Sequence, residues 1–169
     1  RGAALSVYGE LLKWTPWTVV PTHSESFLAA MSGVLQVDEV LDETEYMLVN
    51  ACWSLGLFAL LCRDREEERS KLRGHLPRLL QRLEALVCMD QDEDYSHDLR
   101  TNLASSIGRM ASVAPEQIAG ALPRMLEDLL YCVASMPSAL ETSSVDDEEY
   151  LHAWLGLIAA LKLNPNALM

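Results

Sequence analysis

Positive charge is scarce in this chain of 169 residues. Thirteen lysines and arginines stand against 25 aspartates and glutamates, which gives a formal net charge of −12. A protein that binds a phosphate backbone normally carries an excess of lysine and arginine, so we expect no direct nucleic-acid partner. The imbalance favours a basic protein partner, but an acidic surface is also compatible with solubility alone.

Aromatic residues make up only 7% of the chain, although half of all residues are apolar. Leucine and alanine dominate the apolar half, and the β-branched and aromatic runs that strands prefer are largely missing. We therefore expect an all-α protein with a core of ordinary domain size.

Long apolar runs are missing as well. No stretch approaches the roughly 18 uninterrupted apolar residues that cross a membrane, and the start lacks the basic-then-apolar layout of a signal peptide. We expect a soluble protein with no membrane partner. Because the first residue is Arg1 rather than methionine, we also expect a piece of a longer chain.

No set of catalytic or metal-binding residues stands out. A glycine-rich phosphate loop and a nucleophile elbow are absent, so we expect neither an enzyme nor a cofactor. The histidines lack acidic or cysteine residues at ligand spacing, and the cysteines form no Cys-x-x-Cys pair, which argues against a metal site. Buried free thiols are the expectation, with disulfides left open. The residues concerned are His23, His75, His97 and His152, and Cys52, Cys62, Cys88 and Cys132.

Four glycines recur at nearly equal spacing within apolar, helix-like segments. Successive members lie 47, 52 and 48 residues apart: Gly9, Gly56, Gly108 and Gly156. An asparagine precedes the second and the third of them by six residues in each case. A different segment type lies between, since Leu76-Pro77-Arg78 matches Leu122-Pro123-Arg124. Two alternating helix types at this period indicate a helix-pair repeat.

The pattern predicts a single HEAT-repeat α-solenoid over residues 1–169, with about three and a half helix pairs, as part of a longer solenoid. Helices are predicted near 3–14, 25–36, 44–62, 67–88, 97–113, 115–134 and 147–163, with polar loops at 90–94 and 137–146. Pro115 suits a first helical turn. Pro77 and Pro123 lie at equivalent places inside helical patterns, where each is predicted to kink or break its helix.

Helical spacing places polar and apolar side chains on matching stripes of successive repeats. Asn50, Trp53 and Leu57 form one stripe, and Asn102, Ser105 and Arg109 form the next. Glu10, directly after Gly9, corresponds to Leu57 and Arg109. On one interpretation these residues line a face that binds extended peptides, with tryptophan as an apolar anchor. On the other, Trp53 belongs to the core and the asparagines tie neighbouring helices together.

Acidic clusters precede three of the glycine-bearing helices. Negative charge at a helix N-terminus stabilises the helix by roughly 0.3–1 kcal/mol, which explains much of the pattern. The alternative is that the clusters share one rim and attract a basic peptide. The clusters are Asp42, Glu43 and Glu45; Asp92, Glu93, Asp94 and Asp98; and Asp146, Asp147, Glu148 and Glu149.

Several of these blocks resemble the transportin family of importin-β-type nuclear import receptors. Residues 50–56, Asn-Ala-Cys-Trp-Ser-Leu-Gly, resemble the family's Asn-Ala-Thr-Trp-Ala-Ile-Gly. Residues 102–109 and 115–119 are similar to its Asn-Thr-Ala-Ile-Thr-Ile-Gly-Arg and Pro-Gln-Glu-Val-Ala-Pro. Gly9-Glu10-Leu11 and Leu163-Asn164-Pro165 are similar to its Gly-Asp-Leu and Val-Asn-Pro.

The resemblance implies a HEAT-repeat carrier that shuttles between cytoplasm and nucleus. Its cargo would carry a basic, proline-tyrosine-type localisation signal, and Ran-GTP would release that cargo by binding N-terminal repeats that are missing here. Nucleoporins would be further partners. The family's cargo-surface tryptophan and acidic residue correspond to Trp53 and Glu10.

Two departures from the family pattern weaken the implied apolar pocket. Ser105 stands where the family has isoleucine, and Leu57 stands where it has glutamate. The repeats that hold the proline-tyrosine element would also lie upstream of this chain. The rival interpretation is a HEAT scaffold subunit of the phosphatase or condensin type, with no transport role.

Overall fold

The structure is a computed structural model that describes residues 2–37, 40–89, 96–134 and 146–164. Within these ranges every regular element is an α-helix, and no strand occurs. The all-α prediction is therefore confirmed. The helices are α1 (Gly2–Trp14), α2 (Pro16–Val34), α3 (Asp42–Cys62), α4 (Glu66–Val87), α5 (His97–Val113), α6 (Pro115–Ala134) and α7 (Asp146–Leu163).

Most helix limits agree with the predicted ones to within two residues, but α2 was predicted wrongly. It begins at Pro16 and not near residue 25. Pro16 lies in the first helical turn, where its missing N–H costs nothing, and the helix continues through Pro21. The predicted loop at 90–94 and all but the last residue of the loop predicted at 137–146 lie outside the described residues; Asp146 begins α7.

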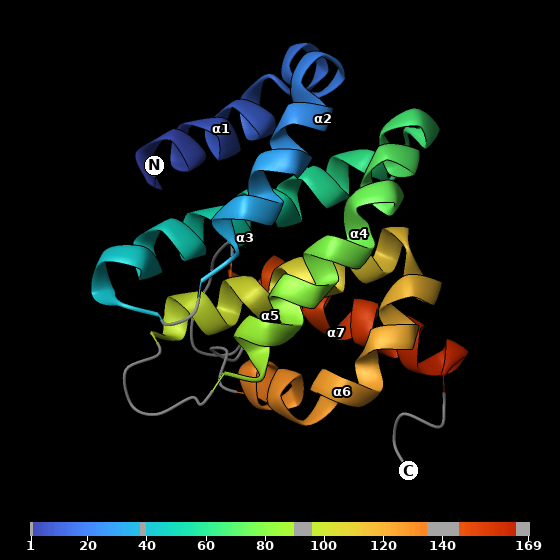
Figure 1. The fold of residues 1–169 in the computed structure, drawn as a ribbon. Coiled ribbons are helices and arrows are strands. Elements are labelled where there is room, and N and C mark those ends of the chain that lie inside the picture. Colours follow the sequence, from blue (N-terminus) through green and yellow to red (C-terminus); the bar gives the residue numbers. More distant parts are fainter. Residues whose placement is uncertain (1, 38–39, 90–95, 135–145, 165–169) are drawn as a thin grey trace.

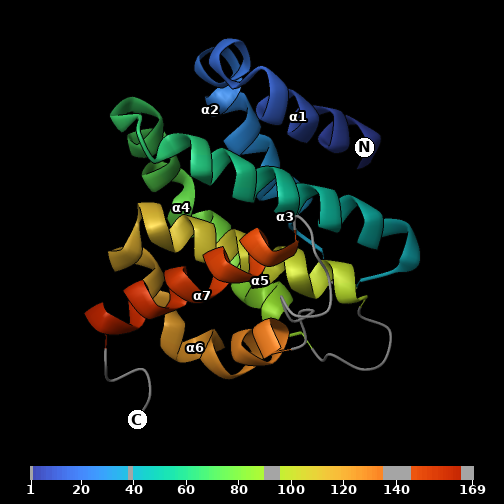
Figure 2. The same ribbon diagram turned by 180° about the vertical axis from the view of Figure 1, so that it is seen from behind.

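The helices form two layers. In one layer α1, α3, α5 and α7 lie side by side in sequence order, and in the other α2, α4 and α6 do the same. Figure 2 faces the first layer, whose four helices run in the same direction. Among the described helices, α1 contacts neither α5 nor α7. The stack is therefore open at both ends, and the four glycine-bearing helices are neighbours as their spacing predicted.

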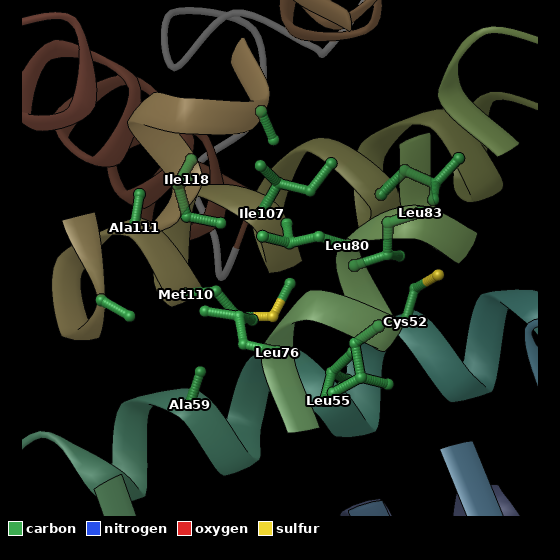
Figure 3. Close-up of a cluster of buried hydrophobic side chains, with 14 of the residues drawn as sticks. Cys52, Leu55, Ala59, Leu76, Leu80, Leu83, Ile107, Met110, Ala111 and Ile118 are labelled. Carbon is green, nitrogen blue, oxygen red and sulfur yellow. The ribbon is translucent and has the colours of Figure 1, made fainter. Parts of the chain in front are cut away.

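Leucine side chains fill the space between the layers. In Figure 3, Leu55 of α3 lies near Leu76 and Leu80 of α4, while Ile107 of α5 lies near Ile118 of α6. All five side chains are at least nine-tenths buried. Burial of one such side chain contributes about 1.5–3 kcal/mol. The core therefore runs continuously along the stack.

An aromatic group extends this core to the first helix pair. The rings of Tyr8 and Phe27 stack with centroids 4.4 Å apart, and Phe27 lies 5.3 Å from Phe58 in a tilted arrangement. Such pairs add about 0.5–1.5 kcal/mol beyond the area that they bury. Helices α1, α2 and α3 are thereby joined through three rings.

Helix α3 is both long and strongly apolar. Residues Thr44–Cys62 are long and apolar enough to cross a membrane by length and composition, but 56% of that window is buried inside the protein. Its neighbours are α1 and α5 within the layer and α2 and α4 in the other layer. A helix covered from several sides must be apolar on several sides, so its position in the stack accounts for its composition.

Glycine allows close approach between helices of the first layer. A Cβ atom at Gly156 would lie 2.0 Å from the Gly108 carbonyl oxygen and 2.5 Å from the Gly108 Cα. At Gly56 the nearest atoms would be Ser106 Oγ at 3.1 Å and Arg109 Cδ at 3.2 Å. Each glycine thus faces the adjacent helix of its own layer.

Two serines use this close approach in the same way. The hydroxyl of Ser54 donates to the Leu5 carbonyl of α1 at 2.9 Å, and the hydroxyl of Ser106 donates to the Cys52 carbonyl of α3. Each serine precedes the glycine of its own helix by two residues. Each carbonyl precedes the glycine of the neighbouring helix by four, so the glycine N–H is its intrahelical donor. Without a Cβ at the glycine, the carbonyl stays open to a second donor.

Prolines inside α4 and α6 break neither helix, contrary to one of the two predicted outcomes. A proline cannot donate to the carbonyl four residues earlier. For Pro77 that carbonyl belongs to Arg73, and Gln117 Nε2 of α6 donates to it at 3.1 Å. For Pro123 it belongs to Ala119, and Asn164 Nδ2 donates to it at 2.9 Å. Each carbonyl that loses its backbone donor therefore accepts a hydrogen bond from a side-chain amide that lies later in the sequence.

The four cysteines are free, and three are buried as predicted. The prediction is wrong for Cys88, which is exposed because it caps the C-terminus of α4, where the layer meets solvent. Burial raises the pKa of Cys52 to about 12. The thiol at that position is therefore a core group that stays protonated at neutral pH.

We expect Gly156→Ala to lower the free energy of unfolding by about 1–3 kcal/mol, the usual cost of overpacking, because its new methyl group would overlap the α5 backbone. Gly74→Ala is the matched control. Gly74 lies in α4 with nothing within 4 Å of its missing Cβ, so this change should stabilise the helix by about 0.5–1 kcal/mol. Urea unfolding followed by circular dichroism measures both. Equal effects would contradict the close contact.

We expect Gln117→Ala to lower the free energy of unfolding by about 1–3 kcal/mol, because it leaves the Arg73 carbonyl without a donor. The loss should be clearly smaller in a Pro77→Ala background, where the restored backbone N–H at position 77 serves that carbonyl. A double-mutant cycle by chemical denaturation measures the coupling. Strictly additive effects of the two changes would show that the amide does not compensate for the proline.

Candidate functional site

The candidate site is the face of the first layer that points away from α2, α4 and α6. On α3, Asn50, Trp53 and Leu57 lie roughly opposite Leu55, which points toward α4 in Figure 3. On α5, Asn102 begins the matching stripe. Because α1, α3 and α5 are adjacent, Glu10, Trp53 and Asn102 lie on neighbouring helices of this layer.

Trp53 lies at the junction of α3 and α1. A Cβ atom at Gly9 would lie 2.1 Å from its Cζ3 and 2.6 Å from its Cε3, so the ring rests on the glycine backbone. The side chain remains partly exposed. Trp53 therefore packs between the two helices, and part of its side chain stays open to solvent.

Glu10 follows Gly9 and is exposed. Its carboxylate accepts a hydrogen bond from Trp14 Nε1 at 2.9 Å. The Trp53 ring packs on Gly9. The carboxylate of Glu10 and the indoles of Trp14 and Trp53 therefore lie at the same end of the layer. Lys13 Nζ already lies 5.6 Å from the centroid of the Trp14 ring, so Glu10 and Trp53 are the groups that suit a ligand with a cationic group and an apolar surface.

The two asparagines have the same local role. Nδ2 of Asn50 donates to the Tyr46 carbonyl at 2.7 Å, and Nδ2 of Asn102 donates to the Asp98 carbonyl at 2.9 Å. Both bonds lie within one helix and span four residues. The proposed link between neighbouring helices through these donors is therefore not what the structure shows. Asn50 is 9% exposed, whereas Asn102 is more accessible.

The remaining predicted residues are less available to a ligand. Ser105 is 1% exposed, and its hydroxyl has no hydrogen-bond partner in the described part of the protein. Its neighbour Ser106 is the serine that bonds to α3. Arg109 is 4% exposed and packs against Gly56. Leu57 is partly buried against the core. A ligand resting on this face would therefore not touch Ser105.

Sequence reasoning missed Tyr46 and Trp14, which are the most exposed aromatic residues among the described side chains of this region. Tyr46 is 60% exposed and precedes Asn50 by one helical turn, and Trp14 is 73% exposed and bonds to Glu10. The signal was available in the sequence, because both lie four residues from a stripe residue. Together with Trp53 they give the face three aromatic side chains.

One predicted acidic cluster has a structural role. Glu45, in the first turns of α3, accepts a hydrogen bond from the Ser96 backbone N–H at 2.8 Å, and the Ser96 hydroxyl accepts from Leu99 N at the start of α5. Glu45 thus holds the N-termini of α3 and α5 together. Asp92, Glu93 and Asp94 lie outside the described residues, as do the side chains of Glu43 and of Asp146 to Glu149.

Comparison of the sequence with protein-family models and with curated proteins finds no match. The described residues contain no group of three or more histidine, cysteine, aspartate or glutamate side chains placed to hold a metal ion.

Proposed function

We propose that this chain is a HEAT-repeat segment of a transportin-like nuclear import receptor, and that the exposed face of α1, α3 and α5 binds protein cargo. Pairs α1–α2, α3–α4 and α5–α6 are the repeats, and α7 begins the next one. The open two-layer stack supports this assignment, because stacked helix pairs bury a continuous core and leave one long face free.

The observation that carries the proposal is the position of Trp53 on Gly9, directly beside the exposed Glu10. An aromatic ring held at a fixed place by a glycine loses little conformational freedom when a peptide packs on it. The adjacent carboxylate attracts a basic side chain of the same peptide. The chain's net charge of −12 acts in the same direction over a longer range.

The ligand class that fits is a basic segment with apolar or aromatic residues, as in a basic proline-tyrosine localisation signal. Glu10, Trp53 and Tyr46 supply charge and apolar surface, while Asn50, Asn102 and Leu57 border them. Ser105 is buried and contributes only to the packing beneath. Ran-GTP would act on N-terminal repeats of the whole receptor, and release of cargo would follow from that event.

The second candidate is a HEAT scaffold of the phosphatase or condensin type. This candidate is favoured by the fact that the predicted site residues already serve the fold. Both asparagine amides donate within their own helices, and Trp53 contributes to helix packing. A scaffold needs no exposed site for a free basic peptide. Peptide binding to this face therefore separates the two candidates.

We expect a fluorescent basic proline-tyrosine peptide to bind the chain weakly, and Trp53→Ala to weaken binding about 10-fold or more, as for a central aromatic anchor. Tyr131→Ala is the matched control, since Tyr131 is an exposed aromatic residue of the other layer. Fluorescence anisotropy at low and high salt measures both affinities. Equal affinities for wild type and the folded Trp53→Ala chain would remove the site assignment, and no binding by any chain would favour the scaffold.

A further inference from the structure

Positive charge is concentrated on one helix of the second layer. Seven of the thirteen lysines and arginines lie within residues 63–82, at the start and along the length of α4. Between residues 69 and 83 the chain has five of these basic residues and no acidic one. Helix α4 lies between α2 and α6, in the layer that Figure 1 faces. This layer therefore carries a local excess of positive charge on a chain whose net charge is −12.

The first turns of α4 neutralise their own basic residues. Arg69 Nη1 lies 3.3 Å from Glu66 Oε2, and Lys71 Nζ lies 3.0 Å from a carboxylate oxygen of Glu67 and 3.0 Å from one of Glu68. These pairs form within one helix at three- and four-residue spacing, and pairs of this kind stabilise a helix only slightly. They need no partner protein.

Arg78 and Arg82 are different, because neither has an acidic partner. They form no ion pair and no side-chain hydrogen bond within the part of the chain that the structure describes. Arg78 is exposed, while Arg82 is partly buried and its Nε is covered without an acceptor. Their four-residue spacing places both on one side of α4. The helix dipole does not account for them, since it acts within the last turn and that turn of α4 contains no basic residue.

The two arginines lie along the boundary between α4 and α2. His75 Nε2 lies 2.8 Å from Glu25 Oε1, so the side of α4 that carries His75 faces α2. Arg82 follows His75 by seven residues and shares that side, whereas the exposed Arg78 is rotated from it by about 60°. Helices α2 and α4 run in the same direction, and α2 has no acidic residue after Glu25. Gly33, nearly level with Arg82, has open space where a side chain would stand.

We propose that Arg78 and Arg82 bind the carboxylates of an acidic segment of a partner protein, which lies along the boundary of α2 and α4. A guanidinium group binds a carboxylate through two parallel hydrogen bonds, which gives the contact strength and direction. Side chains four residues apart on a helix are separated by about 5–6 Å at Cβ, close to the roughly 6–7 Å between alternate residues of an extended chain. The segment that fits therefore has acidic residues at alternate positions.

Charge complementarity with a short peptide is local, which decides between a peptide and a nucleic acid. At physiological salt, charges separated by more than about 8 Å are largely screened, so the acidic remainder of the chain does not prevent a short segment from binding. A longer polyanion would place phosphates beyond the two arginines, where the surface is acidic. Stacking surfaces for bases are also missing, because α4 has no aromatic residue and Phe27 of α2 is buried. This inference does not depend on the proposed cargo function.

Fluorescence anisotropy with a fluorescein-labelled peptide that has glutamate at alternate positions tests the proposal. We expect the wild type to bind with a Kd of about 10–1,000 µM, and the double variant Arg78→Gln/Arg82→Gln to bind about 10-fold or more weakly. Glutamine is a good helix former, so the circular dichroism spectrum should be unchanged. Arg78→Gln alone, at an exposed position, should bind about 3-fold or more weakly and serves if the double variant does not fold.

The matched control is Lys13→Gln/Lys162→Gln. It makes the same change in net charge at two exposed positions of the first layer, and its affinity should equal that of the wild type. The proposal is overturned if the wild type does not bind the peptide at low salt, if the folded Arg78 and Arg82 variants bind as the wild type does, or if the control loses as much affinity as they do.

A single-stranded RNA of the same charge as the peptide is the second probe. Weaker binding of the RNA than of the peptide supports an acidic protein segment as the ligand. Tighter binding of the RNA, lost in the Arg78→Gln/Arg82→Gln variant, would overturn the proposal in favour of a nucleic-acid site.

Discussion

The structure depends on the close approach of neighbouring helices at glycine in the first layer. Where Gly156 meets the Gly108 backbone, no side chain separates the two helices. Glycine inside a helix costs about 0.5–1 kcal/mol relative to alanine. Close packing and the serine hydroxyls that reach carbonyls across the gap, from Ser54 and Ser106, offset that cost. The same approach sets the alignment of the helices, and hence which side chains share a surface.

The layer arrangement was predictable from the sequence because it follows from a regular spacing along the chain. Four glycines at similar intervals and the repeated Leu-Pro-Arg segment identify two helix types, and equivalent helices must then lie next to each other. The early start of α2 was not predictable in the same way. A proline such as Pro21 is unfavourable in a helix interior, so the local sequence argues against a helix at that point. Tertiary packing tolerates that proline in the folded chain.

The candidate site was predictable only in part. Spacing identified the stripe of Trp53 and Glu10, but it did not predict which hydrogen bonds these side chains form or how deeply they are buried. Asn50 has its own helix carbonyl within reach, and burial of Ser105 depends on how closely α5 lies to its neighbours. The amides of Gln117 and Asn164 follow the two prolines by 40 and 41 residues. The two similar spacings can be interpreted only once the structure shows which carbonyls accept from these amides.

Proton NMR at the contact between α5 and α7 tests the central claim most directly. If the helices meet at their backbones, the Hα protons of Gly108 and Gly156 lie within a few ångströms and give a strong nuclear Overhauser effect, since the missing Cβ of Gly156 would lie 2.5 Å from the Gly108 Cα. Assigned resonances with no cross-peak between these two glycines would contradict the account, because side chains would then separate the helices.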